Sequence, residues 1–285
     1  MNKSIIVALD LTDHDLTLIK FAQQVQSTYQ IAKVHFVHNI KISELDEILS
    51  DMMEDRQIGP MISKNLENKI KSIFKESDSY DLTLLEGDNT EFGISEWVKK
   101  MNKPTTALLG WKTVENGTGA MAQKLIRIFQ GDVLLIPRDT SFKMQSILIP
   151  TDLSSNFSKV KNKVEDLLPT GSPFQVSIIK SFNIPSVFFP FIDDQETKVK
   201  AEKLIMVQYE ALKKKLKISD TWSFKAVYQN GKSISDIILR ENKNCGADML
   251  VMAAKGASTI ATIFLGSTTN EIINRDPFQL LYIVK

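Results

Sequence analysis

The sequence has few of the residues on which disulfide, zinc and histidine chemistry depend. Its single cysteine, Cys245, excludes a disulfide within the chain and any zinc or iron–sulfur site built from several cysteines. All three histidines, His14, His35 and His38, lie near the start, so residues 39–285 contain no imidazole. That absence excludes most catalytic-triad and zinc-hydrolase mechanisms from the second half of the chain. The lone cysteine favours a reducing, cytoplasmic setting.

Long apolar runs and an excess of charge of one sign are also missing. No run of about 18 apolar residues occurs, and the residues before Ser4 lack the apolar core of a signal peptide, so we expect neither membrane insertion nor secretion. Lys and Arg number 35 against 34 Asp and Glu, and the net charge of +1 gives no electrostatic reason to expect nucleic-acid binding. The chain is 43% hydrophobic and 285 residues long, which is typical of about two globular domains.

The sequence repeats itself after about 142 residues. Residues 4–12 align without a gap on residues 146–154, and each segment is a short apolar run that ends in Asp, followed by Leu and a hydroxyl residue. Thr12 and Ser154 are therefore candidates for helix caps. Three later pairs match in the same order: 84–87 with 227–231, 107–110 with 250–253, and 133–137 with 280–284. Four collinear matches indicate a tandem duplication, with domains at residues 1–140 and 141–285.

Within each copy, strand-like and helix-like periodicities alternate. The pattern predicts strands at 4–9, 33–39, 81–86, 105–110 and 132–137, and again at 146–151, 174–180, 222–229, 248–253 and 279–284. It predicts helices at 155–168, 193–217, 232–244 and 267–275, and a helical stretch at 44–77 that Gly59-Pro60 should kink or split. This alternation indicates an α/β fold of two tandem doubly wound domains, each with a mainly parallel sheet covered on both faces.

Polar residues suited to an anionic ligand follow two predicted strands of the second copy. Pro150-Thr151-Asp152 ends the first strand, and Met252-Ala253-Ala254-Lys255-Gly256 ends the fourth. Gly266-Ser267-Thr268 then opens a helix, where N–H groups, hydroxyls and a glycine suit phosphate. Doubly wound sheets bind ligands at such strand ends, and an acidic residue there can accept from a ribose hydroxyl. Ordinary helix capping and turn chemistry would use the same residue types and remains the alternative.

Three motifs of the second copy resemble the universal stress protein (UspA-like) family. They are Pro150-x-Asp152-x-Ser154, Gly246-Ala-Asp248, and Gly256 with nine residues before Gly266-Ser267. The resemblance extends over essentially the whole chain, in a tandem two-domain form, and is weaker in the first copy. It implies Rossmann-like domains of the adenine nucleotide alpha hydrolase-like type with strand order 3-2-1-4-5.

The same resemblance implies that ATP, or ADP or AMP, binds in the second copy. The family signature Gly-x2-Gly-x9-Gly-(Ser/Thr) matches at Gly256, Gly266 and Ser267, whereas Ala253 replaces its first glycine and adds a methyl group where backbone meets ligand. Asp152 would contact base or ribose, and the glycine loop ribose and phosphates. Any magnesium would be held by the phosphates, since no carboxylate cluster is evident. The expected binding residues are Pro150, Thr151, Asp152, Met252, Ala253, Lys255, Gly256, Gly266, Ser267 and Thr268.

The first copy departs further from the signature. Gly110 matches the first glycine, but Thr113 stands at the second, only five residues separate it from Gly119, and Ala120 replaces the hydroxyl residue. Asp10 is kept. Residues 1–140 have a net charge of −4 and residues 141–285 of +5, which agrees with an anion in the second copy. We expect the first copy to be a degenerate half with a structural or regulatory role.

The sequence thus predicts a cytoplasmic universal stress protein, a nucleotide-responsive module of the stress response. We expect no turnover enzyme, because no positioned base with an arginine finger is evident. The alternative is an interaction scaffold that binds no nucleotide, both sites having decayed; Ala253 favours it, and the intact Gly266-Ser267 opposes it. The resemblance also implies dimerisation through final strands, so residues 133–137 and 280–284 would pair as an intrachain pseudo-dimer, and a homo-oligomer stays open.

Other residues receive simpler expectations. His14 lies between Asp13 and Asp15 in the first turn of a predicted helix and should be a surface residue. His35 and His38 are three apart on a strand, so their side chains point to opposite faces and form no shared metal site. We expect His38 to be partly exposed. The apolar segment Val187–Ile192 is expected to pack in the seam between domains rather than to cover the pocket.

Overall fold

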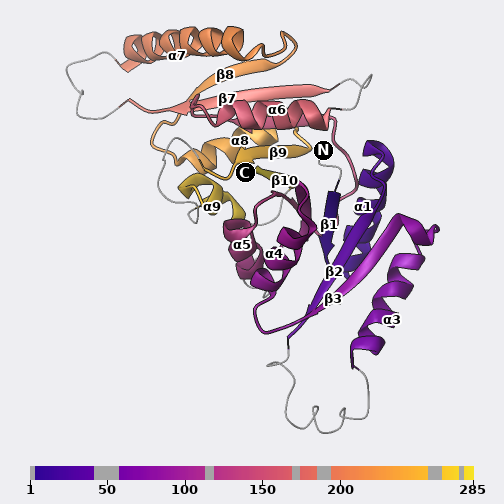
Figure 1. Cartoon of the computed structure of the whole chain (residues 1–285). Helices are drawn as coiled ribbons and strands as arrows, with labels where there is room; N and C mark the ends of the chain where they lie inside the picture. Colours follow the sequence, from indigo (N-terminus) through magenta and orange to yellow (C-terminus); the bar gives the residue numbers. More distant parts are fainter. Residues whose placement is uncertain are drawn as a thin grey trace. The chain divides into compact units, whose positions relative to one another are not determined.

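The protein divides into two compact units, each containing five strands (Figure 1). A computed structural model describes residues 4–41, 58–112, 119–168, 174–184, 194–255, 265–275 and 279–285. The first unit comprises Met1–Phe142 and Ile273–Leu280, and the second comprises Lys143–Ile272 and Leu281–Lys285. Gly256, the Thr113–Thr118 loop and the Val187–Ile192 segment lie outside the described residues.

The first unit is a sheet of strand order β3-β2-β1-β4-β5, and every neighbouring pair is parallel. Helices α1 and α3 contact each other on one face of the sheet, and α4 and α5 contact each other on the other (Figure 1). The strands are β1 (Ser4–Ala8), β2 (Val34–Ile40), β3 (Tyr80–Glu86), β4 (Thr105–Gly110) and β5 (Asp132–Ile136). The helices are α1 (His14–Tyr29), α3 (Ile58–Lys71), α4 (Thr90–Met101) and α5 (Gly119–Ile128), with a 3-10 turn, η2, at Ser77–Ser79.

The second unit repeats this topology in the order β8-β7-β6-β9-β10. Its strands are β6 (Ser146–Pro150), β7 (Gln175–Phe182), β8 (Ser223–Tyr228), β9 (Met249–Ala253) and β10 (Leu280–Val284). Its helices are α6 (Phe157–Leu167), α7 (Asp194–Leu216), α8 (Ile234–Cys245) and α9 (Ser267–Ile273). Read in chain order within each unit, both sheets have the order 3-2-1-4-5, which confirms the fold that the resemblance implied.

Burial explains why the strands could be predicted from the sequence. Strands β1, β5 and β10 are buried at every position, as expected for central parallel strands covered on both faces. Such strands are continuous apolar runs in the sequence. All ten predicted strands are found within two residues of their predicted bounds. Helix α8 ends as predicted at Gly246, whose φ of +60° is the left-handed conformation that glycine adopts without strain.

Two local predictions concern where helices begin. In the predicted 44–77 stretch, the structure describes helix α3 from residue 58, with Gly59-Pro60 in its first turn, where proline fits because a first-turn N–H has no partner within the helix. Residues 42–57 lie outside the described residues, so the kink or two-helix split expected at Gly59-Pro60 stays a prediction. Ser154 is not a helix cap, since α6 begins later, after Asn156, and the Ser154 hydroxyl has no partner in the described part of the chain. Among the described residues, no helix combines the length and apolar character needed to span a bilayer.

Candidate functional site

A pocket of about 480 Å³ lies in the second unit at the carboxyl ends of β6, β7 and β9. Between β6 and β9 the strand order reverses, because the chain continues from β6 to β7 on one side and places β9 on the other. Doubly wound sheets have their binding crevice at this point. The volume is in the range of small-molecule sites, about 300–1,000 Å³.

Every predicted binding residue that the structure describes lines this pocket. The nine are Pro150, Thr151, Asp152, Met252, Ala253, Lys255, Gly266, Ser267 and Thr268. Sequence reasoning missed the other lining residues, which are Asn156, Phe157, Val160, Ile179, Lys180, Ser181, Ile234, Ile238 and Thr269. Lys180 and Ser181 could have been inferred from the end of the second strand of this copy, since parallel strands end at one edge of a sheet.

A tight turn after β6 orients Asp152 toward the pocket's edge. The Asp152 carboxylate accepts the N–H of Ser154 at 2.8 Å, and the Thr151 hydroxyl accepts the N–H of Leu153 at 2.9 Å. Leu153 lies between them with φ of +61°, a conformation that is uncommon for leucine and indicates a turn held by its surroundings. The side-chain-to-backbone bonds of Asp and Thr stabilise such turns.

The opposite wall of the pocket is formed where α9 joins the end of β9. The Gly266 N–H donates to the Ala254 carbonyl at 2.8 Å, and the Thr269 hydroxyl donates to the Ala253 carbonyl at 3.0 Å. The amide of Gly266 is therefore satisfied within the chain, whereas Ser267 and Thr268 contribute their polar atoms to the lining. The turn of α9 is thus placed by main-chain contacts that do not depend on a ligand.

The charges around the pocket suit an anion. Its lining contains two lysines, Lys180 and Lys255, and a single carboxylate, Asp152. The Lys180 ammonium donates to the main-chain oxygen of Asp152 at 2.9 Å, and burial lowers the pKa of Lys180 because it disfavours the charged form. Burial, together with the charge of Lys255, also lowers the pKa of Lys285 to about 8. An anionic ligand would offset the cost of gathering these cations.

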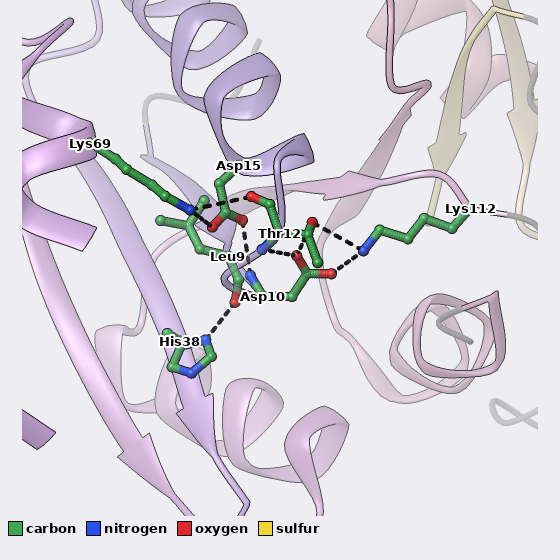
Figure 2. A network of polar contacts seen from close by, with 7 residues as sticks. All are labelled: Leu9, Asp10, Thr12, Asp15, His38, Lys69 and Lys112. Atoms are coloured by element: carbon green, nitrogen blue, oxygen red, sulfur yellow. Dashed lines mark hydrogen bonds and ion pairs between the residues drawn. The ribbon is translucent and has the colours of Figure 1, made fainter. Parts of the chain in front are cut away.

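At the equivalent corner of the first unit, side chains of the chain itself form a network of polar contacts (Figure 2). Lys112, the counterpart of Lys255, hydrogen-bonds the carboxylate of Asp10, the counterpart of Asp152. The Thr12 hydroxyl donates to the same carboxylate at 2.6 Å. Burial alone would raise the pKa of Asp10, but the hydrogen bonds from Lys112 and Thr12 outweigh it and lower that pKa below its ordinary value. The carboxylate therefore has a counter-ion within the chain.

A second ion pair is drawn to the left of this one in Figure 2. The buried carboxylate of Asp15 accepts the N–H of Asp10 at 3.0 Å and the Lys69 ammonium at 3.1 Å. Burial raises the pKa of Asp15 despite these contacts. His38 was expected to be partly exposed, but it is buried and its Nδ1 lies 2.8 Å from the Leu9 carbonyl oxygen, which accepts its N–H. Strand-end carbonyls need such donors where water is excluded.

The sequence pattern of the universal stress protein family matches residues 144–281, which nearly span the second unit. Over these residues the chain belongs to the universal stress protein family. Among curated proteins, no sequence matches the chain closely.

Solved structures resemble the whole chain in fold. A universal stress protein from Archaeoglobus fulgidus is 14% identical with a TM-score of 0.58, covering 99% of this chain and 96% of that one. A functionally unknown protein from Pseudomonas aeruginosa is 12% identical with a TM-score of 0.68, covering 100% of this chain and 92% of that one. At such identities the likeness concerns the fold.

His14 accounts for the glycine at position 110 of the first unit. Contrary to its expected surface position, His14 is 1% exposed, and its ring nitrogens have no partner in the described part of the chain. A Cβ built on Gly110 would lie 2.8 Å from His14 Nδ1, which is closer than side chains pack. The glycine at the family's first signature position thus makes room for an imidazole here.

The burial of His14 predicts a pH-dependent stability of the first unit. Burial and the nearby Lys112 charge lower the pKa of His14 below its ordinary value of 6.5. Below pH 6.5, His14 therefore binds a proton more readily in the unfolded chain than in the folded unit. The contribution of His14 to the free energy of unfolding is fully present above pH 6.5. It should fall as the pH drops below 6.5, by up to about 1.4 kcal/mol per pH unit. Urea unfolding at pH 7.5 and 5.5 measures the effect.

The matched variant for this measurement is His14→Leu, which leaves His35 and His38 in place. It should unfold with a weaker dependence on pH than the wild type over the same interval. An equal dependence in both proteins would assign the effect to another group.

Proposed function

We propose that the second unit of this universal stress protein binds an adenine nucleotide, ATP, ADP or AMP, as part of a regulatory response to stress. One observation supports the proposal above the others. Nine residues chosen from the sequence for nucleotide chemistry lie together around a single pocket, although they come from segments about 100 residues apart. Capping and turn chemistry alone would not require them to share a cavity.

The lining residues suggest how the nucleotide is held. Asp152 is placed to accept a hydrogen bond from a base amine or a ribose hydroxyl. Lys255, Ser267 and Thr268 offer a cation and two hydroxyls to the phosphates. The apolar side chains of Val160, Ile179 and others of the lining provide a surface for the base. Any magnesium would bind the phosphates, and it would reduce their mutual repulsion.

We further propose that only the second unit binds nucleotide. In the first unit, Lys112 pairs with Asp10 and His14 lies against Gly110, so the chain itself occupies the positions where a ligand would meet the carboxylate and the glycine. The first unit then has a structural or regulatory role. We also propose that β5 and β10 pair as an intrachain pseudo-dimer and that the protein is cytoplasmic.

Binding without efficient hydrolysis is the expected activity. Among the described lining residues, no arginine is present to stabilise a transferring phosphoryl group, and Asp152 is the single carboxylate. Phosphoryl transfer depends on such positioned charges. We therefore expect a bound nucleotide to be released largely unhydrolysed.

Calorimetric titration of the purified protein with ATP, AMP and cyclic AMP tests the proposal. We expect saturable heat for at least one of them, with one site per chain, because in the first unit Lys112 already pairs with Asp10. Mass spectrometry of ligand released from freshly purified protein provides a second measurement. Absence of saturable heat for all three, with no released nucleotide, would instead support the interaction scaffold.

A further inference from the structure

Two cations flank the pocket's carboxylate from opposite sides. In the strand order β9-β6-β7, Asp152 follows the middle strand, Lys255 follows β9, and Lys180 is part of β7. Neighbouring strands are about 4.8 Å apart, so the backbones of β7 and β9 are separated by roughly 10 Å. Lys180 and Lys255 thus come from strands on opposite sides of β6.

Lys180 is not required merely to complete the hydrogen bonding of the fold. Its ammonium donates to the main-chain oxygen of Asp152 at the end of β6. At the same register in the first unit stands His38, whose ring serves the main-chain oxygen of Leu9 at the end of β1. Leu9 aligns with Thr151 rather than with Asp152, so the two side chains at this register serve neighbouring carbonyls, and the lysine brings an ammonium group to the pocket.

Lys180 forms no salt bridge with a described residue, and the Asp152 carboxylate acts on its charge only from beyond salt-bridge distance. Among the described residues its hydrogen-bond acceptor is a neutral carbonyl, and no carboxylate lies within ion-pair distance. Burial lowers its pKa, as happens when a cation lacks full compensation. A ligand whose only negative charge lies near Lys255 would leave Lys180 without a salt bridge.

We infer that Lys180 forms a second anion subsite, so that the pocket prefers a nucleotide with phosphates on both the 5′ and the 3′ positions of the ribose. In such a ligand the 5′ phosphate lies at the Lys255 side and the 3′ phosphate pairs with Lys180. Asp152 accepts from a remaining hydroxyl or base amine between them. This inference rests on the nucleotide binding proposed above.

The test compares the affinities of AMP and adenosine 3′,5′-bisphosphate, measured by calorimetry at one salt concentration. The wild type should bind the bisphosphate about 10- to 100-fold more tightly, which is the range expected for one charge-assisted contact in a partly buried site. Lys180→Met should remove this preference, so that the variant binds AMP and the bisphosphate with about equal affinity. Lys180→Arg should retain most of it, because the charge is kept.

Lys232→Met is the matched control, since Lys232 is exposed and outside the pocket lining. It removes one positive charge from the same unit and should keep the bisphosphate preference, which separates a local contact from net charge. If Lys180→Met weakens AMP and bisphosphate equally, Lys180 only positions the turn and the inference is wrong. If AMP binds and the bisphosphate has no advantage, the inference fails while the proposed function stands. Binding of neither ligand overturns both.

Discussion

Replacing Gly266 by glutamate should lower the affinity of the second unit for ATP or AMP by about 100-fold or more. Gly266 lines the pocket beside Ser267 and is placed by its bond to the Ala254 carbonyl. A carboxylate there would lie near the nucleotide's phosphates, and two like charges about 4 Å apart in partly screened surroundings repel by about 4 kcal/mol. A loss of 2.7 kcal/mol already corresponds to about 100-fold in affinity.

The control for this variant is Gly59→Glu in helix α3 of the first unit. A Cβ on Gly59 would meet no atom within 4 Å, so the same substitution fits there without a clash and changes the net charge identically. Nucleotide titration of both variants, with circular dichroism to verify folding, gives the comparison. Wild-type affinity in Gly266→Glu would mean that the phosphates do not approach this turn.

Replacing Asp15 by alanine should destabilise the first unit by about 3 kcal/mol. The buried carboxylate accepts both the N–H of Asp10 and the Lys69 ammonium. Its removal leaves the Asp10 N–H without this acceptor and leaves Lys69 with only the Thr12 carbonyl, 3.3 Å away. Removing one partner of a buried ion pair costs about 3–5 kcal/mol, and Lys69 is 23% exposed, which places the effect at the lower end.

Tryptophan fluorescence can follow this effect in one unit at a time. Trp97 and Trp111 belong to the first unit and Trp222 to the second, so a Trp222→Phe background reports urea unfolding of the first unit. Asp15→Asn is the matched variant, because it retains an oxygen for the Asp10 N–H and should lose less stability than Asp15→Ala. Equal stability of all three proteins would show that the network contributes little.

The fold could be predicted from the sequence because its signals are local. Each central strand is a short apolar run, and turns such as Cys245-Gly246 end the helices between them. The repeat then reduced the problem to one domain topology seen twice. Residues such as Asp152 and Gly266 were predictable for the same reason, since strand ends and helix starts have recognisable compositions.

The errors occurred where exposure depends on packing between distant segments. His14 is flanked by two aspartates, a pattern that predicts a solvated helix start, yet the first turn of α1 packs against Gly110 at the end of β4. Gly110 matched a nucleotide signature, but here it accommodates the imidazole. Likewise, no sequence pattern predicts the ion pair between Lys112 and Asp10, because the two residues are separated by 102 positions.

The amino-acid order by itself determined the two α/β copies, their strand positions and the residue types that surround the pocket, because hydrophobic periodicity and turn chemistry act over a few neighbouring residues. Only the tertiary structure decided that nine predicted residues of the second copy line one pocket, and that in the first copy Lys112 pairs with Asp10 and His14 lies against Gly110. The physical reason is that charge pairing and burial depend on distances between strand ends, and folding, not sequence spacing, sets those distances.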